Sequence, residues 1–456
     1  MFWLRDRRVA LAALTMFTLL SGDAWRYSIT WFGWGAVVLV IVVGWTLVAV
    51  RRRVNLRRIP IALGTLLGLR AASIVWSFYP GATALGVVST VATAFVGVVM
   101  AHTLSLEQLL RALGVASRFI IGLSLVFELV VAVVFRRPVL PLWVSYDEPI
   151  PLPFFWSRNL LLDGGRIQGI PGNANLLAFA ALIAVIVFAI QLAERRVGQA
   201  AGWGWLGAAL LTLALTRSST VIVAGLAAIV ALAIVLLARR LSTRGQLTLY
   251  GLTALASGGV VVGALTLREQ LLDLLGRSDD LTGRLDIWAA VTDLSAERPV
   301  LGWGWVSYWA PWVEPFDDLV IINGVRYLQA HNAWLDVLLQ LGWVGLLVFT
   351  ILIVTAGARV LSWSVDAPLG DAAPTPALQL LPGLLFTVLL VHSLAESRLL
   401  IEAGFVLLVY LATASRMRGV TVPPVERTPG PEPAPVSARE PANSTLKPVA
   451  MPEVTS

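Results

Sequence analysis

Residues 219–238 read STVIVAGLAAIVALAIVLLA, twenty consecutive residues without a charge. A helix needs about 20 apolar residues to cross the hydrocarbon core of a bilayer, so this stretch predicts a membrane-spanning helix. The whole chain is 57% hydrophobic and only 13% charged. Such a composition is typical of polytopic membrane proteins and excludes an ordinary soluble globular domain.

Apolar segments of this kind recur along the chain, and most approach the same length. We therefore expect an all-α fold, a polytopic transmembrane bundle of about twelve helices. The first segment is short and follows three arginines, so a signal peptide is an alternative there, although no small-x-small cleavage site follows it. The predicted segments lie near residues 9–22, 31–50, 59–78, 81–103, 115–135, 173–193, 200–216, 219–238, 248–267, 332–356, 378–395 and 399–415.

The short connections between these segments differ in charge. Arginines gather on one side, whereas the other side carries only Arg26, Arg217 and Arg398 in its short connections. By the positive-inside rule both termini are cytoplasmic, and two long loops, about 136–172 and 268–331, face outward. The net charge of +7 follows from these clusters and does not indicate a nucleic-acid partner. The cytoplasmic arginines are Arg51, Arg52, Arg53, Arg57, Arg58, Arg111, Arg195, Arg196, Arg239, Arg240, Arg244, Arg359, Arg416 and Arg418.

The chain changes character after the last apolar segment. Residues 419–456 are polar and rich in proline, and such a segment buries too little apolar surface to offset the entropy of ordering it. We expect a transmembrane domain over residues 1–418, followed by a disordered cytoplasmic tail over 419–456.

Groups that transfer protons or hold anions are scarce. The chain has three histidines and no cysteine, which excludes disulfides and thiol catalysis. His331 closes the second outward loop, in the sequence His331-Asn332-Ala333-Trp334-Leu335. An imidazole, with an ordinary pKa of about 6.5, accepts a proton near neutrality more readily than any other side chain. His331 is therefore our candidate base, with an interfacial polar residue as the alternative.

The first outward loop contains four arginines, against the usual charge bias. Arg136 and Arg137 at a helix end are suited to lipid headgroups. Arg166 lies between glycines and a helix start, Gly172-Asn173-Ala174-Asn175, whose free amides would form an anion site. We therefore predict a phosphate-binding role for Arg166.

The second outward loop mixes arginines with acids. Arg284 and Trp288 are four residues apart and share one face of any helix. Several acids are expected to pair with the arginines. A divalent cation at Asp279-Asp280 is a weaker alternative, because no further ligand cluster accompanies the pair.

These motifs, taken in order, resemble the O-antigen ligase and O-antigen polymerase family. The resemblance covers residues 10–415, and each motif is weak alone while the ordered set is fairly specific. The motifs are Ser73-Ile74-Val75-Trp76-Ser77-Phe78-Tyr79-Pro80, Gly165-Arg166 with Asn173, Thr216-Arg217-Ser218-Ser219, Gly283-Arg284-Leu285-Asp286-Ile287-Trp288, Arg298-Pro299-Val300-Leu301-Gly302-Trp303-Gly304, His331-Asn332-Ala333-Trp334-Leu335 and Gly342-Trp343-Val344-Gly345-Leu346-Leu347.

The resemblance implies a C-type glycosyltransferase-like enzyme in the bacterial cytoplasmic membrane. It would move a glycan from an undecaprenyl-pyrophosphate donor to a hydroxyl of a glycan, lipid or protein acceptor on the outer face, with no metal, cofactor or nucleotide sugar. Carried over, His331 would be the base, and Arg284 and Arg166 would hold the pyrophosphate. The expected substrate-binding residues are Arg217, Asn332, Trp288 and Asn173.

One departure and two alternatives accompany this prediction. Family members often have an acid where this chain has Gln340, which puts any helper carboxylate there in doubt. A polymerase that joins lipid-linked repeat units fits the same motifs as a ligase. A transporter or flippase would fit the helix count, but it would place charges at mid-membrane. The clearest charges there are Arg70 and Glu128, for which a structural ion pair is one alternative.

Overall fold

The computed structural model describes residues 6–146, 149–266, 279–322, 324–366 and 377–418. The chain divides into two units, Met1–Val420 and Thr421–Ser456, and every described residue belongs to the first. The predicted tail, and Arg268, Arg277 and Ser278 of the second loop, lie outside the described residues.

The described residues form 13 α-helices and a two-stranded antiparallel sheet, so the all-α prediction is confirmed. Twelve of these helices coincide with the predicted apolar segments. Six of the 13 are long and apolar enough to cross a membrane, so the number of crossings stays a prediction. The elements are α1 (Arg7–Leu20), α2 (Gly22–Arg52), α3 (Ile61–Ala72), α4 (Pro80–Thr103), α5 (Leu106–Val130), α6 (Ala174–Ala193), α7 (Gln199–Thr216), α8 (Ser219–Ala238), α9 (Thr243–Thr266), α11 (Asp279–Glu297), β1 (Ile321–Ile322), β2 (Val325–Arg326), α12 (Ala333–Val365), α13 (Leu380–His392) and α14 (Glu402–Arg418).

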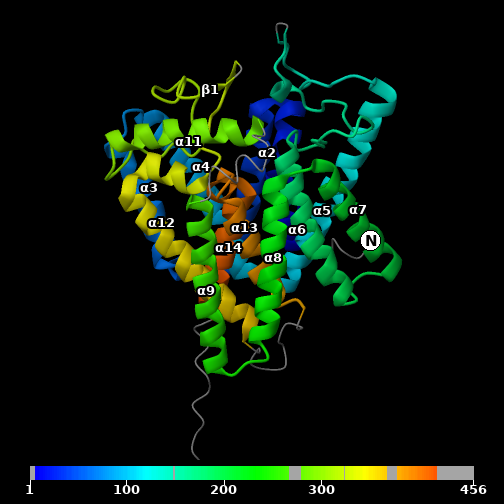
Figure 1. Ribbon diagram of the computed structural model, residues 1–456, viewed down its shortest axis with the longest axis vertical. Coiled ribbons are helices and arrows are strands. Elements are labelled where there is room, and N and C mark those ends of the chain that lie inside the picture. Colours follow the sequence, from blue (N-terminus) through cyan, green and yellow to red (C-terminus); the bar gives the residue numbers. More distant parts are fainter. Residues whose placement is uncertain (1–5, 147–148, 267–278, 323, 367–376, 419–456) are drawn as a thin grey trace, which may run out of the picture. The chain divides into compact units, whose positions relative to one another are not determined.

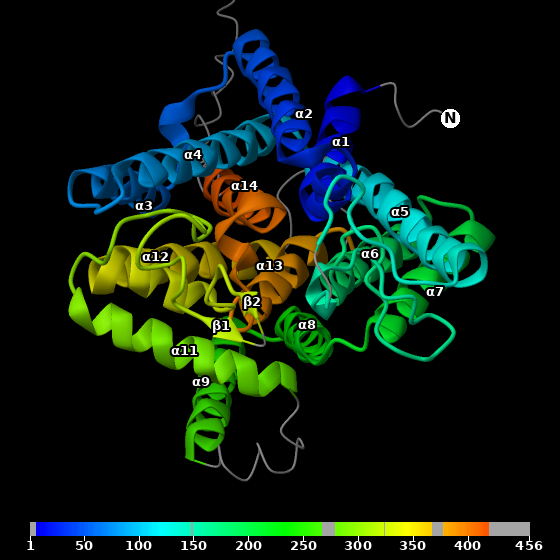
Figure 2. The ribbon, with the colours of Figure 1, turned by 90° about the horizontal axis from the view of Figure 1, so that it is seen from above.

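Helix α14 lies in the middle of the bundle, between α4, α12 and α13 (Figures 1 and 2). Residues 403–415 of α14 are buried without interruption, because neighbouring helices cover it on every side. Small residues let these helices approach closely. At Gly97 of α4, an added Cβ would come within 2.9 Å of the Val406 carbonyl oxygen. This packing fixes the start of α14 beside the turn that follows α13.

The second long connection contains a helix, α11, within what the sequence suggests is a polar loop. Figure 1 shows α11 lying across the axes of α8 and α9, and Figure 2 shows it running beside α12. Its apolar side, with Ile287 and Val291, packs on Trp309 and Phe316 of the connection to α12. This small core fixes Arg284 and Trp288, which lie on α11, relative to the start of α12.

A backbone ladder joins the Arg298–Gly304 motif to a kink in α12 at Gly342. Trp343 N donates to Pro299 O at 2.8 Å and Gly304 N donates to Gln340 O at 2.9 Å. Gly342 has φ +64°, and a Cβ there would lie 2.3 Å from the Val300 carbonyl carbon. Only glycine allows this approach. The contact between the Arg298–Gly304 segment and the kink at Gly342, called the joint below, therefore has a structural role.

Arg70 and Glu128 have other partners, so the alternative of an ion pair between them does not hold. Glu128 of α5 accepts hydrogen bonds from the first long connection, from Ser157 Oγ at 2.8 Å and Gly169 N at 2.6 Å. Arg70 stacks on Trp305, with its guanidinium carbon 3.7 Å from the ring centroid. A buried carboxylate can accept hydrogen bonds from the backbone amides of a loop as well as from an arginine. Composition alone does not show which of these two kinds of donor Glu128 has.

Candidate functional site

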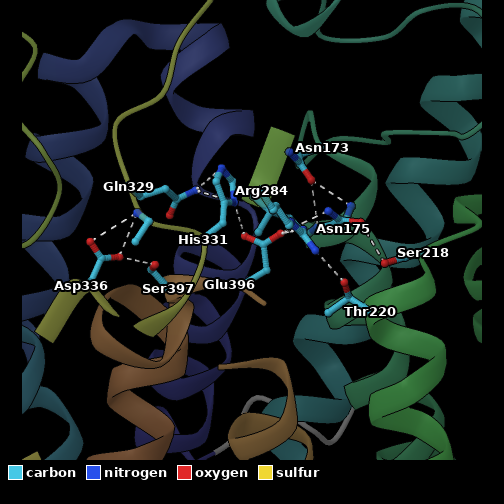
Figure 3. A network of polar contacts seen from close by, with 12 residues as sticks. Asn173, Asn175, Ser218, Thr220, Arg284, Gln329, His331, Asp336, Glu396 and Ser397 are labelled. Atoms are coloured by element: carbon cyan, nitrogen blue, oxygen red, sulfur yellow. Dashed lines mark hydrogen bonds and ion pairs between the residues drawn. The ribbon is translucent and has the colours of Figure 1, made fainter. Parts of the chain in front are cut away.

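The carboxylate of Glu396 is the centre of a polar network between the two long connections (Figure 3). Glu396 lies in the turn after α13 and is 3% exposed. Its Oε2 contacts His331 Nδ1 at 2.9 Å, and its Oε1 accepts from Arg284 Nη2 at 2.8 Å and from Asn175 Nδ2 at 3.1 Å. One carboxylate thus connects α6, α11, the start of α12 and the end of α13.

The partners of Glu396 have further partners of their own. Arg166 Nη2 donates to Asn175 Oδ1 at 2.7 Å, and Ser218 Oγ donates to the same oxygen at 2.8 Å. Arg284 Nη1 donates to Thr220 Oγ1 at 3.1 Å (Figure 3). Both arginines therefore belong to one connected network. Arg284 joins Glu396 directly, and Arg166 joins it through Asn175.

His331 occupies a strained backbone position immediately before α12. Its φ is +47°, which is uncommon for a residue with a side chain and is found preferentially at functional sites. When Nδ1 donates to the Glu396 carboxylate, the neutral imidazole carries its lone pair on Nε2. The His331 side chain is 19% exposed, against 4% for Glu396. The imidazole is therefore more accessible to solvent than the carboxylate, which stays buried behind it.

Two opposing effects set the ionisation of Glu396. Burial alone would raise its pKa, but the contacts with His331 and Arg284 outweigh burial and hold the pKa at about 2. The group therefore carries its charge at every physiological pH. A fixed anion behind the imidazole stabilises the imidazolium that forms when His331 accepts a proton.

Asp336 braces the two residues at the centre of the network. Its Oδ1 accepts from Trp309 Nε1 at 2.9 Å and from Ala330 N at 3.3 Å, and its Oδ2 accepts from Ser397 Oγ. Ala330 precedes His331 and Ser397 follows Glu396, so one buried carboxylate holds the backbone amide beside His331 and the side chain beside Glu396 (Figure 3). Trp288 adds a second brace, since its Nε1 donates to Ala330 O at 2.9 Å.

The structure brings together the three residues predicted as catalytic, His331, Arg284 and Arg166, which come from separate motifs. Whether they act in catalysis remains a prediction. Arg217 does not join their hydrogen-bonded network among the described residues. Its side chain is exposed, and its Nη2 would lie 3.6 Å from a Cβ built on Gly164.

The two predicted asparagines are helix caps. Asn332 Oδ1 accepts from Trp334 N at 2.9 Å, and Asn173 Oδ1 accepts from Asn175 N at 2.8 Å and from Leu176 N at 3.3 Å. The expectation of free amides at residues 172–175 fails for two of the four, because Asn175 N donates to the cap and Gly172 N donates to Gly169 O at 3.1 Å. Substrate contacts by Asn173, Asn332 and Trp288 stay predictions.

Sequence reasoning missed Glu396, Asn175 and Asp336. The available signal was the turn Leu394-Ala395-Glu396-Ser397-Arg398, an acid and a base between two apolar segments. Gln340 also has a defined place, since its Oε1 accepts from Val306 N at 2.9 Å and Ser307 N at 3.0 Å. It holds the connection before α12 and is not hydrogen-bonded to Glu396 or His331.

Metal ligands do not gather at this site. Within the part of the chain that the structure describes, no group of three or more His, Asp and Glu side chains has the arrangement of a metal site. The side chains of Asp279 and Asp280 are not among those described, so the weaker metal alternative there remains open.

Known proteins match parts of this chain. A family model described as O-Antigen ligase matches residues 204–350, a range that contains Arg217, Arg284 and His331. The exopolysaccharide production protein ExoQ of Rhizobium meliloti (strain 1021) is 26% identical over 207 residues, which are 43% of this chain and 47% of ExoQ. The chain thus spans about half the length of the curated relative it matches. The apolar helices make this a multi-pass membrane protein, and the two matches confirm its resemblance to the O-antigen ligase family.

Proposed function

We propose that this protein transfers a glycan from an undecaprenyl-pyrophosphate donor to an acceptor hydroxyl at the outer face of the bacterial cytoplasmic membrane. The observation that carries the proposal is the Glu396 carboxylate held between His331 and Arg284 at 2.9 Å and 2.8 Å. A base with a fixed counter-ion lies beside a guanidinium that suits a phosphate. The family resemblance supplies the donor class.

The proposed step uses each group once. Nε2 of His331 removes the proton of the acceptor hydroxyl as that oxygen attacks the anomeric carbon. The bond between that carbon and the pyrophosphate oxygen breaks, and its electron pair leaves with the undecaprenyl pyrophosphate. Arg284 and Arg166 stabilise the negative charge that grows on the leaving group. Glu396 stabilises the imidazolium.

Metal independence follows from the same chemistry. Guanidinium forks supply positive charge that a divalent cation provides in other pyrophosphate enzymes. The donor already contains an activated bond, so the reaction needs no nucleotide. We expect purified protein to act on a lipid-linked donor in the presence of a chelator and without ATP. Activity that chelator removes and magnesium or manganese restores would argue against arginines acting alone.

A polymerase is the second candidate. The matched relative is named as an exopolysaccharide production protein, and joining repeat units uses the same base and leaving group. The two activities differ only in the acceptor. Loss of a polymerase leaves single repeat units on the lipid carrier, whereas loss of a ligase leaves finished polymer on that carrier.

The decisive experiment compares a gene deletion complemented by wild type, His331→Ala or His331→Asn. We expect both variants to insert into the membrane and to lose transfer by about 10²–10⁴-fold, the usual effect of removing a general base, while lipid-linked glycan accumulates on the outer face. Accumulation on the inner face would instead identify a transporter or flippase. Full complementation by His331→Ala would refute the assignment of the base.

A further inference from the structure

A groove lies between α3, α12 and the end of α14, far along these helices from the Glu396 network. It encloses about 400 Å³. Pro60, Ile61, Ala62 and Thr65 form one wall. The other wall belongs to α12, whose start at residue 333 contacts the network and whose later turns form this groove. The groove is thus independent of the proposed reaction.

The α12 wall is an apolar stripe that ends in a cation. Val348, Ile351, Thr355 and Arg359 line it, and spacings of three and four residues keep them on one face of the helix. The eleven steps from Val348 to Arg359 span about 16 Å at 1.5 Å per residue. One leaflet of a bilayer core is about 15 Å deep. The wall therefore has the length of a single acyl layer.

The charge of the groove lies at one end only. Arg359 and Arg416 are the basic residues of its lining, and none of the described residues that line it is acidic. Arg416 donates from Nη1 to the Ile59 carbonyl, which fixes this guanidinium at the entrance to α3. Guanidinium has five N–H donors, so further donors remain for a ligand. Arg57 and Arg58 lie in the preceding turn.

We propose that this groove binds an anionic phospholipid of the cytoplasmic leaflet. Its phosphodiester headgroup would contact Arg359 and Arg416, and one acyl chain would lie along the α12 stripe. Three observations favour this occupant over another protein helix. The wall matches one leaflet in depth, its apolar residues face outward (Ile61 is 79% exposed and Ile351 is 44% exposed), and its cations lie at the end that the positive-inside rule makes cytoplasmic.

The test measures lipid retention by the full chain. The protein is purified from vesicles of phosphatidylcholine with phosphatidylglycerol, and the bound lipids are counted by native mass spectrometry. We expect wild type to retain phosphatidylglycerol in preference to phosphatidylcholine. We expect Arg359→Gln with Arg416→Gln to reduce that preference by about tenfold, since each surface arginine strengthens anionic lipid binding several-fold. Arg51→Gln with Arg52→Gln, with the same loss of charge at the same end of the bundle, should retain it.

A second variant distinguishes lipid binding in the groove from lipid binding to a charged surface alone. Ala62→Trp fills the groove and leaves both arginines in place, so it should also reduce retention of phosphatidylglycerol. The single variant Arg359→Gln removes no hydrogen bond recorded among the described residues, which guards against a folding defect. Three outcomes would each overturn the proposal. They are equal retention of both lipids by wild type, an equal loss of phosphatidylglycerol retention in both arginine double variants, and no effect of Ala62→Trp on that retention. Transfer activity is not part of this assay.

Discussion

At the residue scale, the candidate site depends on buried anions that hold cations and a base in place. Glu396 contacts His331 and Arg284 directly, and Asp336 accepts from the Ala330 amide beside His331 and from the Ser397 hydroxyl beside Glu396. An isolated charge would be costly at such depth, but here each carboxylate has several donors. We expect Glu396 to act in the chemistry, Arg284 and Arg166 in donor binding, and Asp336 in positioning.

Replacing Glu396 with Gln should lower kcat by about 10²-fold, because the imidazolium loses its counter-ion. The donor KM should not rise, since Arg284 loses a competing anion. Wild-type Glu396 is ionised above about pH 2, so no limb of the pH–rate profile between pH 5 and 9 comes from it. Initial rates of wild type and Glu396→Gln across that range check both points.

Stability gives a second measurement for the same group. The pKa of Glu396 is lowered from 4.5 to about 2 in the folded protein. Its ionised form therefore stabilises the fold fully above pH 4.5, and this contribution is lost as the pH falls toward 2. Thermal melts of Glu396→Gln should lack this acid-dependent component. Glu297→Gln, on the exposed side of α11, should melt as wild type does, and an identical loss in both variants would contradict the assignment.

Lysine should replace Arg284 and Arg166 poorly. Arg284 uses two nitrogens to reach Glu396 and Thr220, and Arg166 bridges Thr216 and Asn175. A single ammonium cannot reproduce a fork. We expect kcat/KM for the donor to fall by about tenfold or more in each variant. Arg136→Lys and Arg137→Lys are the controls and should be nearly silent. Wild-type turnover in the two test variants would point to general electrostatics.

Asp336→Asn tests the positioning role of the buried brace. The asparagine amide has the same shape as the carboxylate, but its NH2 group cannot accept a hydrogen bond. Whichever way the amide is turned, this group lies against a donor, either Ser397 Oγ or Trp309 Nε1. We expect kcat to fall about tenfold while the donor KM stays near its wild-type value. The exposed residue Asp286 supplies the matched control, Asp286→Asn. If kcat and KM change together, or only membrane insertion suffers, Asp336 has no specific role in alignment.

At the element scale, the joint between α12 and the Arg298–Gly304 segment decides where His331 lies. The ladder fixes the connection before α12 against the kink at Gly342. The segment then continues through the small core with Trp309 and Phe316 to the site. Gly302, Gly304 and Gly342 therefore have a structural role in this joint, since each has a positive φ and a close neighbour where a Cβ would lie.

Gly342→Ala should destabilise the protein by about 2 kcal/mol or more, because φ of +64° is strained for alanine and its Cβ would meet the Val300 backbone at 2.3 Å. Thermal unfolding in detergent measures the effect. Gly251→Ala on α9 is the control, since nothing lies within 4 Å of a Cβ there. A Gly342→Ala variant as stable as wild type would show that the joint is not structural.

At the scale of the whole molecule, the orientation in the membrane decides which face the site serves. The arginine clusters predict that both long connections face outward. Ser157 of the first long connection is unsuitable for cysteine labelling, because it is buried and bonded to Glu128. Leu162 is 72% exposed and Ala296 lies on the exposed side of α11. Both are therefore suitable positions for cysteine labelling.

In intact cells, an impermeant thiol reagent should label Leu162→Cys and Ala296→Cys but not Ser242→Cys, which lies between α8 and α9. The chain has no native cysteine, so the background is clean. All three variants should react after the membrane is permeabilised. Labelling of Ser242→Cys in intact cells would reverse the orientation, and the proposed outward site with it.

The sequence alone predicted twelve of the 13 described α-helices and the membrane environment, because long uncharged segments have no other stable state in lipid. It also indicated His331, Arg284 and Arg166, since bases and forked cations are rare in such a chain. Only the tertiary structure showed that His331 and Arg284 meet at Glu396 and that Arg166 joins them through Asn175. It also separated Arg70 from Glu128, and assigned Asn173 and Asn332 to helix caps. The reason is that helix packing sets which polar group faces which partner, and residues 166, 284, 331 and 396 are brought together only when distant helices pack.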